Sequence, residues 1–227
     1  MLRSIAKSIY RALNKLLGAS VGFQIVRGYH GIRRDKSHIH HQKIYPHASY
    51  APWIDDVEFN DIYEVAKDYT LVDVYRLYEL FNLSKQYAFA DGAFLEVGVW
   101  RGGSSAVIQK ALRNSGNKEA KLYIADTFEG VVKAGSPKDT FYSGGEHSDT
   151  SINLVQELFE KVNLPLPIIL KGIFPDDNPT AINEKICFLH SDVDAYESTK
   201  DIIEWAMPRL CKNAIIVFDD YGFSNCE

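Results

Sequence analysis

The spacing of hydrophobic positions changes twice along this chain, and each change predicts a different kind of structure. Over residues 1–17 apolar side chains recur every three or four positions, which predicts a helix. Over residues 37–92 a polar stretch is followed by a second helical pattern, which predicts a linker and covering helices. From residue 93 short apolar runs alternate with amphipathic segments. We therefore divide the chain into 1–36, 37–92 and 93–227.

The last of these parts predicts an α/β fold. Its apolar runs are expected to form five strands, at 93–99, 121–127, 167–172, 186–192 and 214–220. Amphipathic segments at 103–113, 151–162 and 198–210 predict helices between the strands. Strands that are apolar throughout are typical of a parallel sheet covered by helices on both faces. Such a doubly wound sheet binds ligands at the carboxyl ends of its strands.

Charge separates the first 36 residues from the rest. They contain eight basic residues and one acidic residue, whereas the remainder contains 17 basic and 29 acidic residues. On the predicted first helix one face carries Arg3, Lys7, Arg11 and Lys15. One interpretation is peripheral docking on an anionic membrane surface. The other is that this helix packs on the protein's own body or on a second subunit of a homo-oligomer.

Composition excludes several classes of protein. No apolar run approaches the roughly 20 residues that span a bilayer, so we expect no transmembrane segment. The first 20 residues lack the uninterrupted apolar region of a signal peptide. Cys187, Cys211 and Cys226 show no metal-ligand spacing. We expect a cytoplasmic protein, with the inner face of the membrane as its one candidate attachment site and no nucleic acid as a partner.

Glycines and an acidic residue follow the first two predicted strands. The first strand leads through Glu96 into a turn that contains Gly98 and Gly102, and a helix then begins near Ser104. Glycines let a backbone approach a ligand, and a helix start offers free N–H groups to a carboxylate or phosphate. Asp126, at the end of the second strand, can accept both hydroxyls of a ribose, although a capping or turn residue is the alternative. Together these residues indicate a ligand that contains adenosine.

The third strand ends at Gly172, and Phe174 follows it closely. These two residues are candidates for the wall of an adenine pocket. An aromatic residue at a strand end is more often part of the core, which is the alternative for Phe174.

Acidic residues follow the last two predicted strands. Asp192 and Asp194 end one strand, and Asp219 and Asp220 end the other. Adjacent parallel strands bring these carboxylates to one rim of the sheet, where they repel each other. A hard cation such as Mg²⁺ relieves that repulsion and prefers oxygen ligands. Helix caps and salt bridges are the alternative.

These segments resemble the macrocin and mycinamicin sugar O-methyltransferases. The resemblance spans about residues 93–223 and rests on segments that occur in order: FLEVGVWRGGSSAVI, YIADTFEGV, GGEHSDTS, LKGIFPD, HSDVDAYESTKD and AIIVFDDYGF. It implies the Rossmann-like fold of methyltransferases that use S-adenosylmethionine. It also implies a divalent cation, usually Mg²⁺, that chelates two neighbouring oxygens of the substrate.

The resemblance assigns a role to each candidate residue. Glu96, Gly98 and Ser104 would contact the methionine part of the donor, Asp126 would contact its ribose, and Gly102 is a further donor-binding residue. The residues that would hold the metal are Asp192, Asp219 and Asp220. Two residues are candidates to accept the proton of the attacking hydroxyl: Asp192 itself, and His147, whose alternative is an ordinary exposed loop position.

This chain departs from the family pattern at its end. The family fold continues after DDYG with a helix and two strands, whereas this chain stops at Glu227, so we expect a core truncated at its C-terminus and an edge strand that carries Asp219. The expected function is transfer of a methyl group to a sugar hydroxyl of a small-molecule or lipid-linked acceptor, in glycan, lipopolysaccharide or glycosylated natural-product synthesis. A metal-dependent catechol or phenol methyltransferase and a non-catalytic truncated scaffold are the alternatives.

Overall fold

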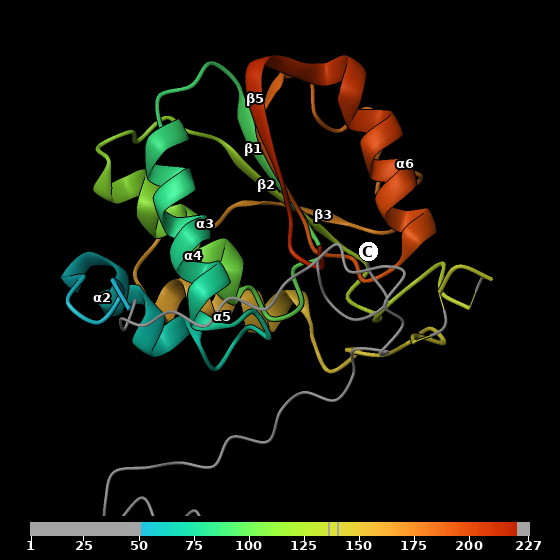
Figure 1. Cartoon of the computed structure of the whole chain (residues 1–227), viewed down its shortest axis with the longest axis horizontal. Helices are drawn as coiled ribbons and strands as arrows, with labels where there is room; N and C mark the ends of the chain where they lie inside the picture. The colour runs from blue at the N-terminus through green and yellow to red at the C-terminus, as the bar shows by residue number, and fades with distance from the viewer. Residues whose placement is uncertain (1–50, 136, 140, 222–227) are drawn as a thin grey trace, which may run out of the picture. The chain divides into compact units, whose positions relative to one another are not determined.

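The computed structural model describes residues 51–135, 137–139 and 141–221, so the basic helix predicted within residues 1–36 lies outside the described residues. The described chain contains a five-stranded sheet in the order β3-β2-β1-β4-β5, and every neighbouring pair of strands is parallel (Figure 1). The strands are β1 (Ala93–Val97), β2 (Leu122–Asp126), β3 (Ile168–Lys171), β4 (Ile186–Ser191) and β5 (Leu210–Phe218). The predicted α/β fold with a parallel sheet is confirmed.

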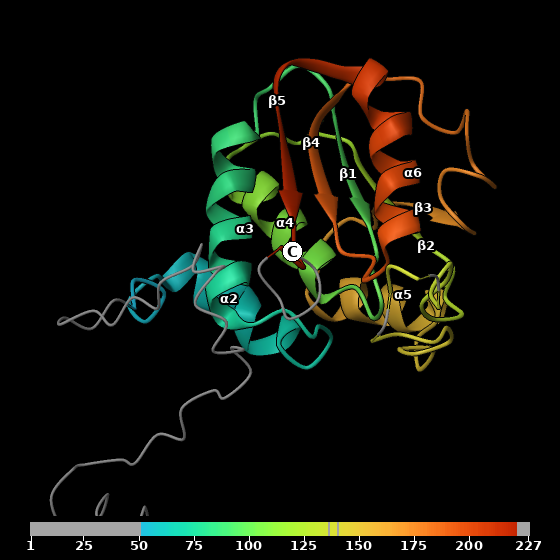
Figure 2. The ribbon, with the colours of Figure 1, turned by 45° about the vertical axis from the view of Figure 1, so that its right-hand side comes forward.

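Helices cover both faces of this sheet. They are α2 (Val57–Ala66), α3 (Val74–Tyr87), α4 (Gly103–Asn114), α5 (Ile152–Lys161), α6 (Tyr196–Ala206) and the 3-10 helix η2 (Met207–Arg209). Figure 2 shows α3 and α4 on one side of the strands and α6 on the other. Alternate residues of β1 point to the two faces, because Phe94 belongs to the core under α3 and α4 whereas Leu95 and Val97 belong to the core under α6.

The helix boundaries follow from local chemistry. Asp56, Asp73 and Ser151 precede α2, α3 and α5, and each side chain accepts a hydrogen bond from the first turn of its helix. The helices predicted at 103–113 and 151–162 correspond to α4 and α5. The helix predicted at 198–210 is shorter at its C-terminal end, because Pro208 lies in η2 and β5 already begins at Leu210 rather than at the predicted residue 214.

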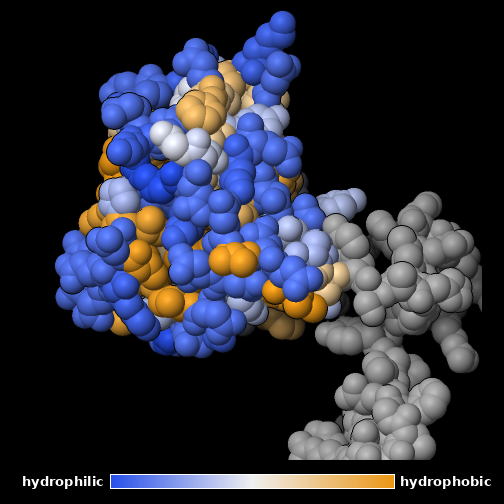
Figure 3. All heavy atoms as spheres, turned by 90° about the vertical axis from the view of Figure 1, so that its left-hand side faces the viewer, coloured by the Kyte–Doolittle hydropathy of each residue, from blue (hydrophilic) through white to orange (hydrophobic). Residues whose placement is uncertain are grey.

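The described residues before β1, 51–92, belong to the same compact unit as the sheet. Phe59 of α2 and Phe81 of α3 are fully buried and belong to the same core as α4. Figure 3 faces the side of the molecule on which α2 lies, where hydrophilic residues are interrupted by separate hydrophobic areas. Ile54 and Val57, beside and within α2, are among the exposed apolar side chains of this unit.

Strand β5 forms one edge of the sheet, and in the described part of the chain no strand pairs with its outer side. The predicted position of the Asp219 strand at an edge is thus confirmed for these residues. Among the helices that the structure describes, none has the length and apolar content needed to cross a membrane.

Candidate active site

A cavity of about 350 Å³ opens at the carboxyl ends of the strands. Parallel strands all end on this side of the sheet, so residues far apart in the sequence meet there. Nine of the residues predicted for the site line the cavity: Gly98, Ser104, Asp126, His147, Gly172, Phe174, Asp192, Asp219 and Asp220. Glu96 and Gly102, which the resemblance places against the donor, are not among the described lining residues.

The turn after β1 brings the backbone of the first strand against that of the fourth. Gly98 has φ of +91°, and a β-carbon there would overlap the carbonyl oxygen of Asp192. Gly102 precedes α4 with φ of +89° and packs on Val155 of α5, which explains its position away from the cavity. Ser104 lies in the first turn of α4, whose N-terminus has no side-chain cap. Gly103 donates its N–H to the Tyr69 carbonyl at 2.9 Å, so the N–H groups that the first turn of α4 can offer to a ligand begin at Ser104, which lines the cavity.

Asp126 organises this turn. Its Oδ2 accepts hydrogen bonds from the backbone N–H groups of Val99, at 2.7 Å, and Trp100, at 3.0 Å. Its Oδ1 accepts one from the N–H of Phe128 at 2.6 Å. A carboxylate has about four acceptor positions, so about one remains for a ligand. Asp126 is therefore a turn residue, which was the alternative interpretation from the sequence. Its side chain also lines the cavity, where a ligand can reach it.

Phe174 and His147, two further residues predicted for the site, line other parts of the cavity. Phe174 is buried and packs edge-to-face on Trp205 of α6, with ring centroids 4.7 Å apart, so it belongs to the core as well as to the cavity wall. His147 lies beside Tyr142, with ring centroids 5.8 Å apart. The loop that carries His147 is attached to the glycine turn, because Trp100 Nε1 donates to Asp149 Oδ1 at 2.9 Å.

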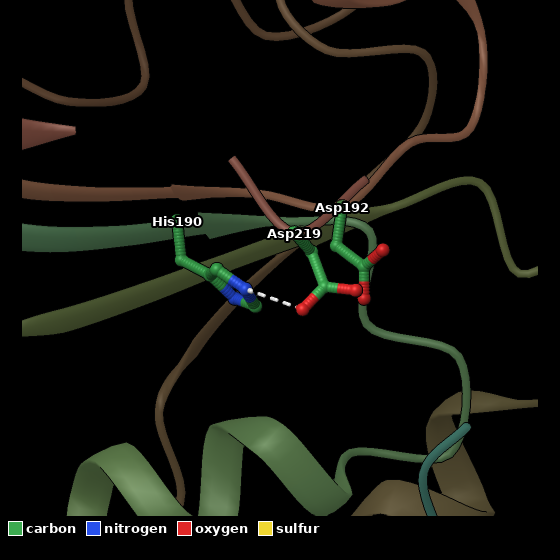
Figure 4. Close-up of side chains that lie close together, drawn as sticks. All are labelled: His190, Asp192 and Asp219. Atoms are coloured by element: carbon green, nitrogen blue, oxygen red, sulfur yellow. Dashed lines mark ion pairs between the residues drawn. The ribbon is translucent and has the colours of Figure 1, made fainter. Parts of the chain in front are cut away.

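Asp192, after β4, and Asp219, after β5, lie close together, whereas Asp220, predicted with them, is outside the group. Asp192, Asp219 and His190 each offer one ligand atom, and these atoms lie within 4.8 Å of one another. Figure 4 shows the carboxylate of Asp192 beside that of Asp219, with the ring of His190 directed toward Asp219. Asp220 lines the cavity but is outside this group, and its Oδ2 accepts a hydrogen bond from the N–H of Asp194 at 3.1 Å.

Burial and charge set the protonation of these groups. Burial, and after it the charge of Asp219, raises the pKa of Asp192 well above its ordinary value. Burial and the nearby Asp194 raise the pKa of Asp220 to about 6. Burial by itself lowers the pKa of His190, but the neighbouring carboxylates of Asp219 and Glu96 raise it to about 10. The carboxylates therefore crowd one another, as expected where a cation would be stabilised.

Two residues of this cluster were not identified from the sequence. Arg76 of α3 donates from its guanidinium to Asp219 Oδ2 and, at 3.2 Å, to the Asp219 carbonyl. His190 Nδ1 lies 2.9 Å from Glu96 Oε1, and its Nε2 lies 3.8 Å from Asp219 Oδ1. No spacing rule links Arg76 to a residue so distant in the chain. His190 follows four apolar residues in β4, and an ionisable residue at the end of so apolar a run was the available signal.

The residues present fit a divalent cation. Two carboxylates and one imidazole converge, and His190 Nε2 is a buried nitrogen without a hydrogen-bond partner among the described residues. Oxygen and imidazole ligands suit Mg²⁺ or a transition metal respectively. The glycine turn, Asp126 and the carboxylates of Asp192 and Asp219 line one cavity, so a donor and an acceptor could be held side by side there.

Comparison with known proteins places this arrangement in a family. The profile of the macrocin-O-methyltransferase family, TylF, matches residues 59–227. The chain belongs to this family. The predicted resemblance to the macrocin O-methyltransferases is thus confirmed, and the match begins within α2, so it includes the helices that precede β1.

Two named O-methyltransferases are similar to this chain over part of their length. The 8-demethyl-8-(2,3-dimethoxy-alpha-L-rhamnosyl)-tetracenomycin-C 4'-O-methyltransferase of Streptomyces olivaceus is 32% identical over 170 residues, which cover 70% of this chain and 65% of that protein. The mycinamicin III 3''-O-methyltransferase of Micromonospora griseorubida is 31% identical over 146 residues, which cover 60% of this chain and 58% of that protein. The chain thus spans less than two thirds of the length of either relative.

Solved structures agree on the fold. The O-methyltransferase NovP superposes with a TM-score of 0.58 at 25% identity, covering 66% of each chain. The calicheamicin methyltransferase CalS11 superposes with a TM-score of 0.55 at 16% identity, covering 77% of this chain and 80% of its own. The Rossmann-like methyltransferase fold predicted for this member of the macrocin O-methyltransferase family is confirmed.

Proposed function

We propose that this protein transfers a methyl group from S-adenosylmethionine to a hydroxyl of a sugar, assisted by a divalent cation. The observation that carries the proposal is one cavity that joins the glycine turn and Asp126 to Asp192 and Asp219. Membership of the macrocin O-methyltransferase family supports methyl transfer. Two relatives whose names specify a glycosylated natural product, one rhamnosyl-tetracenomycin and one mycinamicin, support a sugar as the acceptor.

The donor half of the site is built by the turn after β1. The donor would supply an electrophilic methyl group on a sulfonium. Gly98 leaves room at the strand end, and the first turn of α4 near Ser104 offers N–H groups to the donor's carboxylate. Asp126 holds the turn in shape and keeps about one acceptor position for a ribose hydroxyl. Gly172 and Phe174 supply the wall for the adenine.

The acceptor half lies at the acidic cluster. A cation there, held by Asp192 and Asp219 with Asp220 at the wall of the same cavity, would lower the pKa of the attacking hydroxyl and chelate a vicinal diol. Asp192 accepts the proton, because a carboxylate whose pKa is raised by burial is a better base than an ordinary aspartate. Fixing acceptor and donor at adjacent positions supplies most of the remaining acceleration, since attack on the methyl group needs orientation.

A pair of matched acceptors tests this function. A methyl rhamnoside with a vicinal diol and its analogue lacking one of the two hydroxyls are incubated with the full chain, labelled donor and Mg²⁺, with and without chelator. We expect methylation of the diol glycoside only, and loss of that methylation when chelator is present. Methylation of catechol in place of both glycosides would replace the sugar assignment with a phenol methyltransferase. Absence of donor binding in calorimetry would count against the enzyme altogether.

A further inference from the structure

Trp100, in the turn between β1 and α4, has an unfavourable backbone conformation. Its φ is +48°, in the left-handed region that few residues other than glycine adopt and that is rare for a bulky side chain. Trp100 also lines the cavity, together with Ser104 and His147. A strained residue at a binding cavity persists only where its surroundings hold it, so its contacts identify what maintains the strain.

Three residues outside the turn hold Trp100 in this conformation. Its backbone N–H donates to Asp126 Oδ2 at 3.0 Å, and its carbonyl accepts a hydrogen bond from the Thr150 hydroxyl. Its indole Nε1–H donates to Asp149 Oδ1 at 2.9 Å. Both backbone polar groups and the one polar atom of the side chain therefore have partners. Two of these partners, Asp149 and Thr150, lie in the segment that follows His147.

Asp149 also binds the next residue of the turn. Arg101 Nε donates to the Asp149 carbonyl at 2.9 Å, and the Arg101 guanidinium donates to Asp149 Oδ2 at 2.5 Å. The same guanidinium lies 4.4 Å from the centroid of the Trp100 ring, within the range of a cation–π contact. The hydrogen bond from Trp100 and the positive charge of Arg101 lower the pKa of Asp149. Asp149 is therefore ionised at neutral pH, and both of its carboxylate oxygens accept.

Stability alone does not account for these contacts. The side chain of Asp149 is 63% exposed and that of Arg101 31%, and ion pairs this open to water contribute little to stability. Asp149 is not among the described residues that line the cavity. Its influence on a bound ligand therefore passes through Trp100 and Arg101.

We propose that Asp149 is a positioning residue for the methyl donor, and that it acts by holding Trp100 as a wall of the donor site. This inference rests on the donor of the proposed function. Trp100 is bonded to Asp126, the residue assigned to the donor's ribose, so a displaced Trp100 would disturb that side chain as well. Only molecules in which the turn is held bind the donor, and the dissociation constant rises in proportion as their fraction falls.

Two substitutions of Asp149 separate the indole bond from the ion pair. Asp149→Asn keeps an oxygen that accepts from Trp100 Nε1–H but loses the charge that faces Arg101, whereas Asp149→Ala loses both. We expect the dissociation constant for S-adenosylhomocysteine, measured by calorimetry on the full chain, to stay within about threefold of wild type in Asp149→Asn and to rise about tenfold in Asp149→Ala. Asp61→Ala is the matched control, because Asp61 is 65% exposed and pairs with Lys110 across two helices. It should leave the constant unchanged.

Trp100→Phe tests the indole bond from its other side. It removes Nε1–H, keeps an aromatic ring against Arg101, and should weaken binding of S-adenosylhomocysteine by about 3- to 10-fold. Because Trp100→Phe and Asp149→Ala remove the same bond, the double variant should bind within about twofold of Asp149→Ala, whereas independent effects would multiply. Multiplied losses would show that Asp149 acts without Trp100 and would overturn the proposal.

Spectra of the ¹⁵N-labelled indole groups give a readout that a purely structural role would not change. The chain contains three tryptophans, and the indole N–H signal of Trp100 is the one that Trp100→Phe removes. This signal should move when S-adenosylhomocysteine is added to wild type, and in Asp149→Ala it should be displaced before any ligand is added.

The positioning role and the proposed function fail in different ways. A Trp100 signal that ignores the ligand in wild type would overturn the positioning role, as would equal dissociation constants for wild type and Asp149→Ala. Equal losses in Asp149→Asn and Asp149→Ala would overturn it too, because the indole bond would then be irrelevant. If wild type binds no S-adenosylhomocysteine at all, the donor site of the proposed function fails first, and the positioning role fails with it.

Discussion

Gly98 at the end of β1 touches the backbone carbonyl of Asp192 after β4, and no side chain fits between them. Gly98→Ala should therefore lower the free energy of unfolding by more than about 2 kcal/mol, since a left-handed φ alone costs an L-residue about 1–2 kcal/mol. Urea unfolding measures this loss. Gly116→Ala is the control, because Gly116 has φ of +86° but no atom within 4 Å of its added β-carbon. Equal losses in the two variants would show that the close approach is unimportant.

Asp126 is expected to act through the turn as well as through the donor. Asp126→Asn replaces one carboxylate oxygen by an NH₂ group, which cannot accept from Val99 and Trp100 or else from Phe128. Each lost charge-assisted bond is worth about 1.5–3 kcal/mol, so the dissociation constant for S-adenosylhomocysteine should rise more than tenfold in calorimetry. Asn117→Ala, which removes a similar turn bond to Glu119 and Ala120, should leave that constant unchanged. Unchanged binding in Asp126→Asn would contradict the assignment.

Removal of carboxylates from the predicted ligand set should abolish metal-dependent turnover. Asp219→Asn and Asp220→Asn each remove one negative charge from the predicted ligand set, so turnover of the diol glycoside should fall by at least about 100-fold, the lower end of what a catalytic group contributes. Donor affinity should change little, because the glycine turn is intact. Asp61→Asn is the control, since Asp61 pairs with Lys110 on an exposed surface. Full activity of the wild type in excess chelator would be inconsistent with a metal centre.

Asp192 and His147 are both candidates to accept the proton, and substituting them should affect kcat differently. If Asp192 accepts the proton, Asp192→Asn lowers kcat by about 10²- to 10⁴-fold, whereas His147→Ala changes kcat by less than about tenfold. The reason is position, because Asp192 lies in the cluster with Asp219 and His147 lies in a loop beside Tyr142. Single-turnover rates under saturating acceptor measure this difference. The reverse order of effects would transfer the role to His147.

The basic segment at the start of the chain is predicted to act apart from catalysis. We expect removal of residues 1–18 to abolish sedimentation with vesicles rich in anionic lipid, while methylation of a water-soluble glycoside is unchanged. Each of Arg3, Lys7, Arg11 and Lys15 is worth about 1 kcal/mol near such a surface. Sedimentation in low salt with anionic and neutral vesicles checks the prediction. Retention of the full chain in the supernatant with both would indicate packing on the protein or on a second subunit instead.

The parallel sheet could be predicted because its signals are local. Apolar strands and amphipathic helices alternate, and the carboxyl ends of adjacent strands necessarily meet, so the order of residues alone was enough to place Asp192 and Asp219 together. The start of β5 was predicted four residues too late. The strand begins immediately after η2, which contains Pro208, and its first half includes exposed polar residues that hide the strand pattern.

The contacts that depend on three dimensions were not predictable. Arg76 approaches Asp219 because α3 packs beside the sheet, and no periodicity records that packing. The sequence identified Glu96 as an acidic residue at a strand end. It did not show which face of the sheet the Glu96 side chain is on, because alternate residues of β1 face opposite sides. From the sequence, Asp126 could equally bind a ligand or stabilise a turn. The structure shows that it does the latter, because its Oδ2 accepts hydrogen bonds from the N–H groups of Val99 and Trp100.

The ion pair between Arg76 and Asp219 determines which fragment of this protein can retain the acidic cluster. A fragment that begins at β1 would retain every strand and every predicted ligand to the metal, yet it would lose the guanidinium that faces an almost fully buried carboxylate. That carboxylate would then face Asp192 with only His190, at 3.8 Å, to offset the repulsion, and uptake of a proton by the pair would be favoured. The helices before β1 are therefore part of the smallest unit in which this acidic cluster can keep its charge.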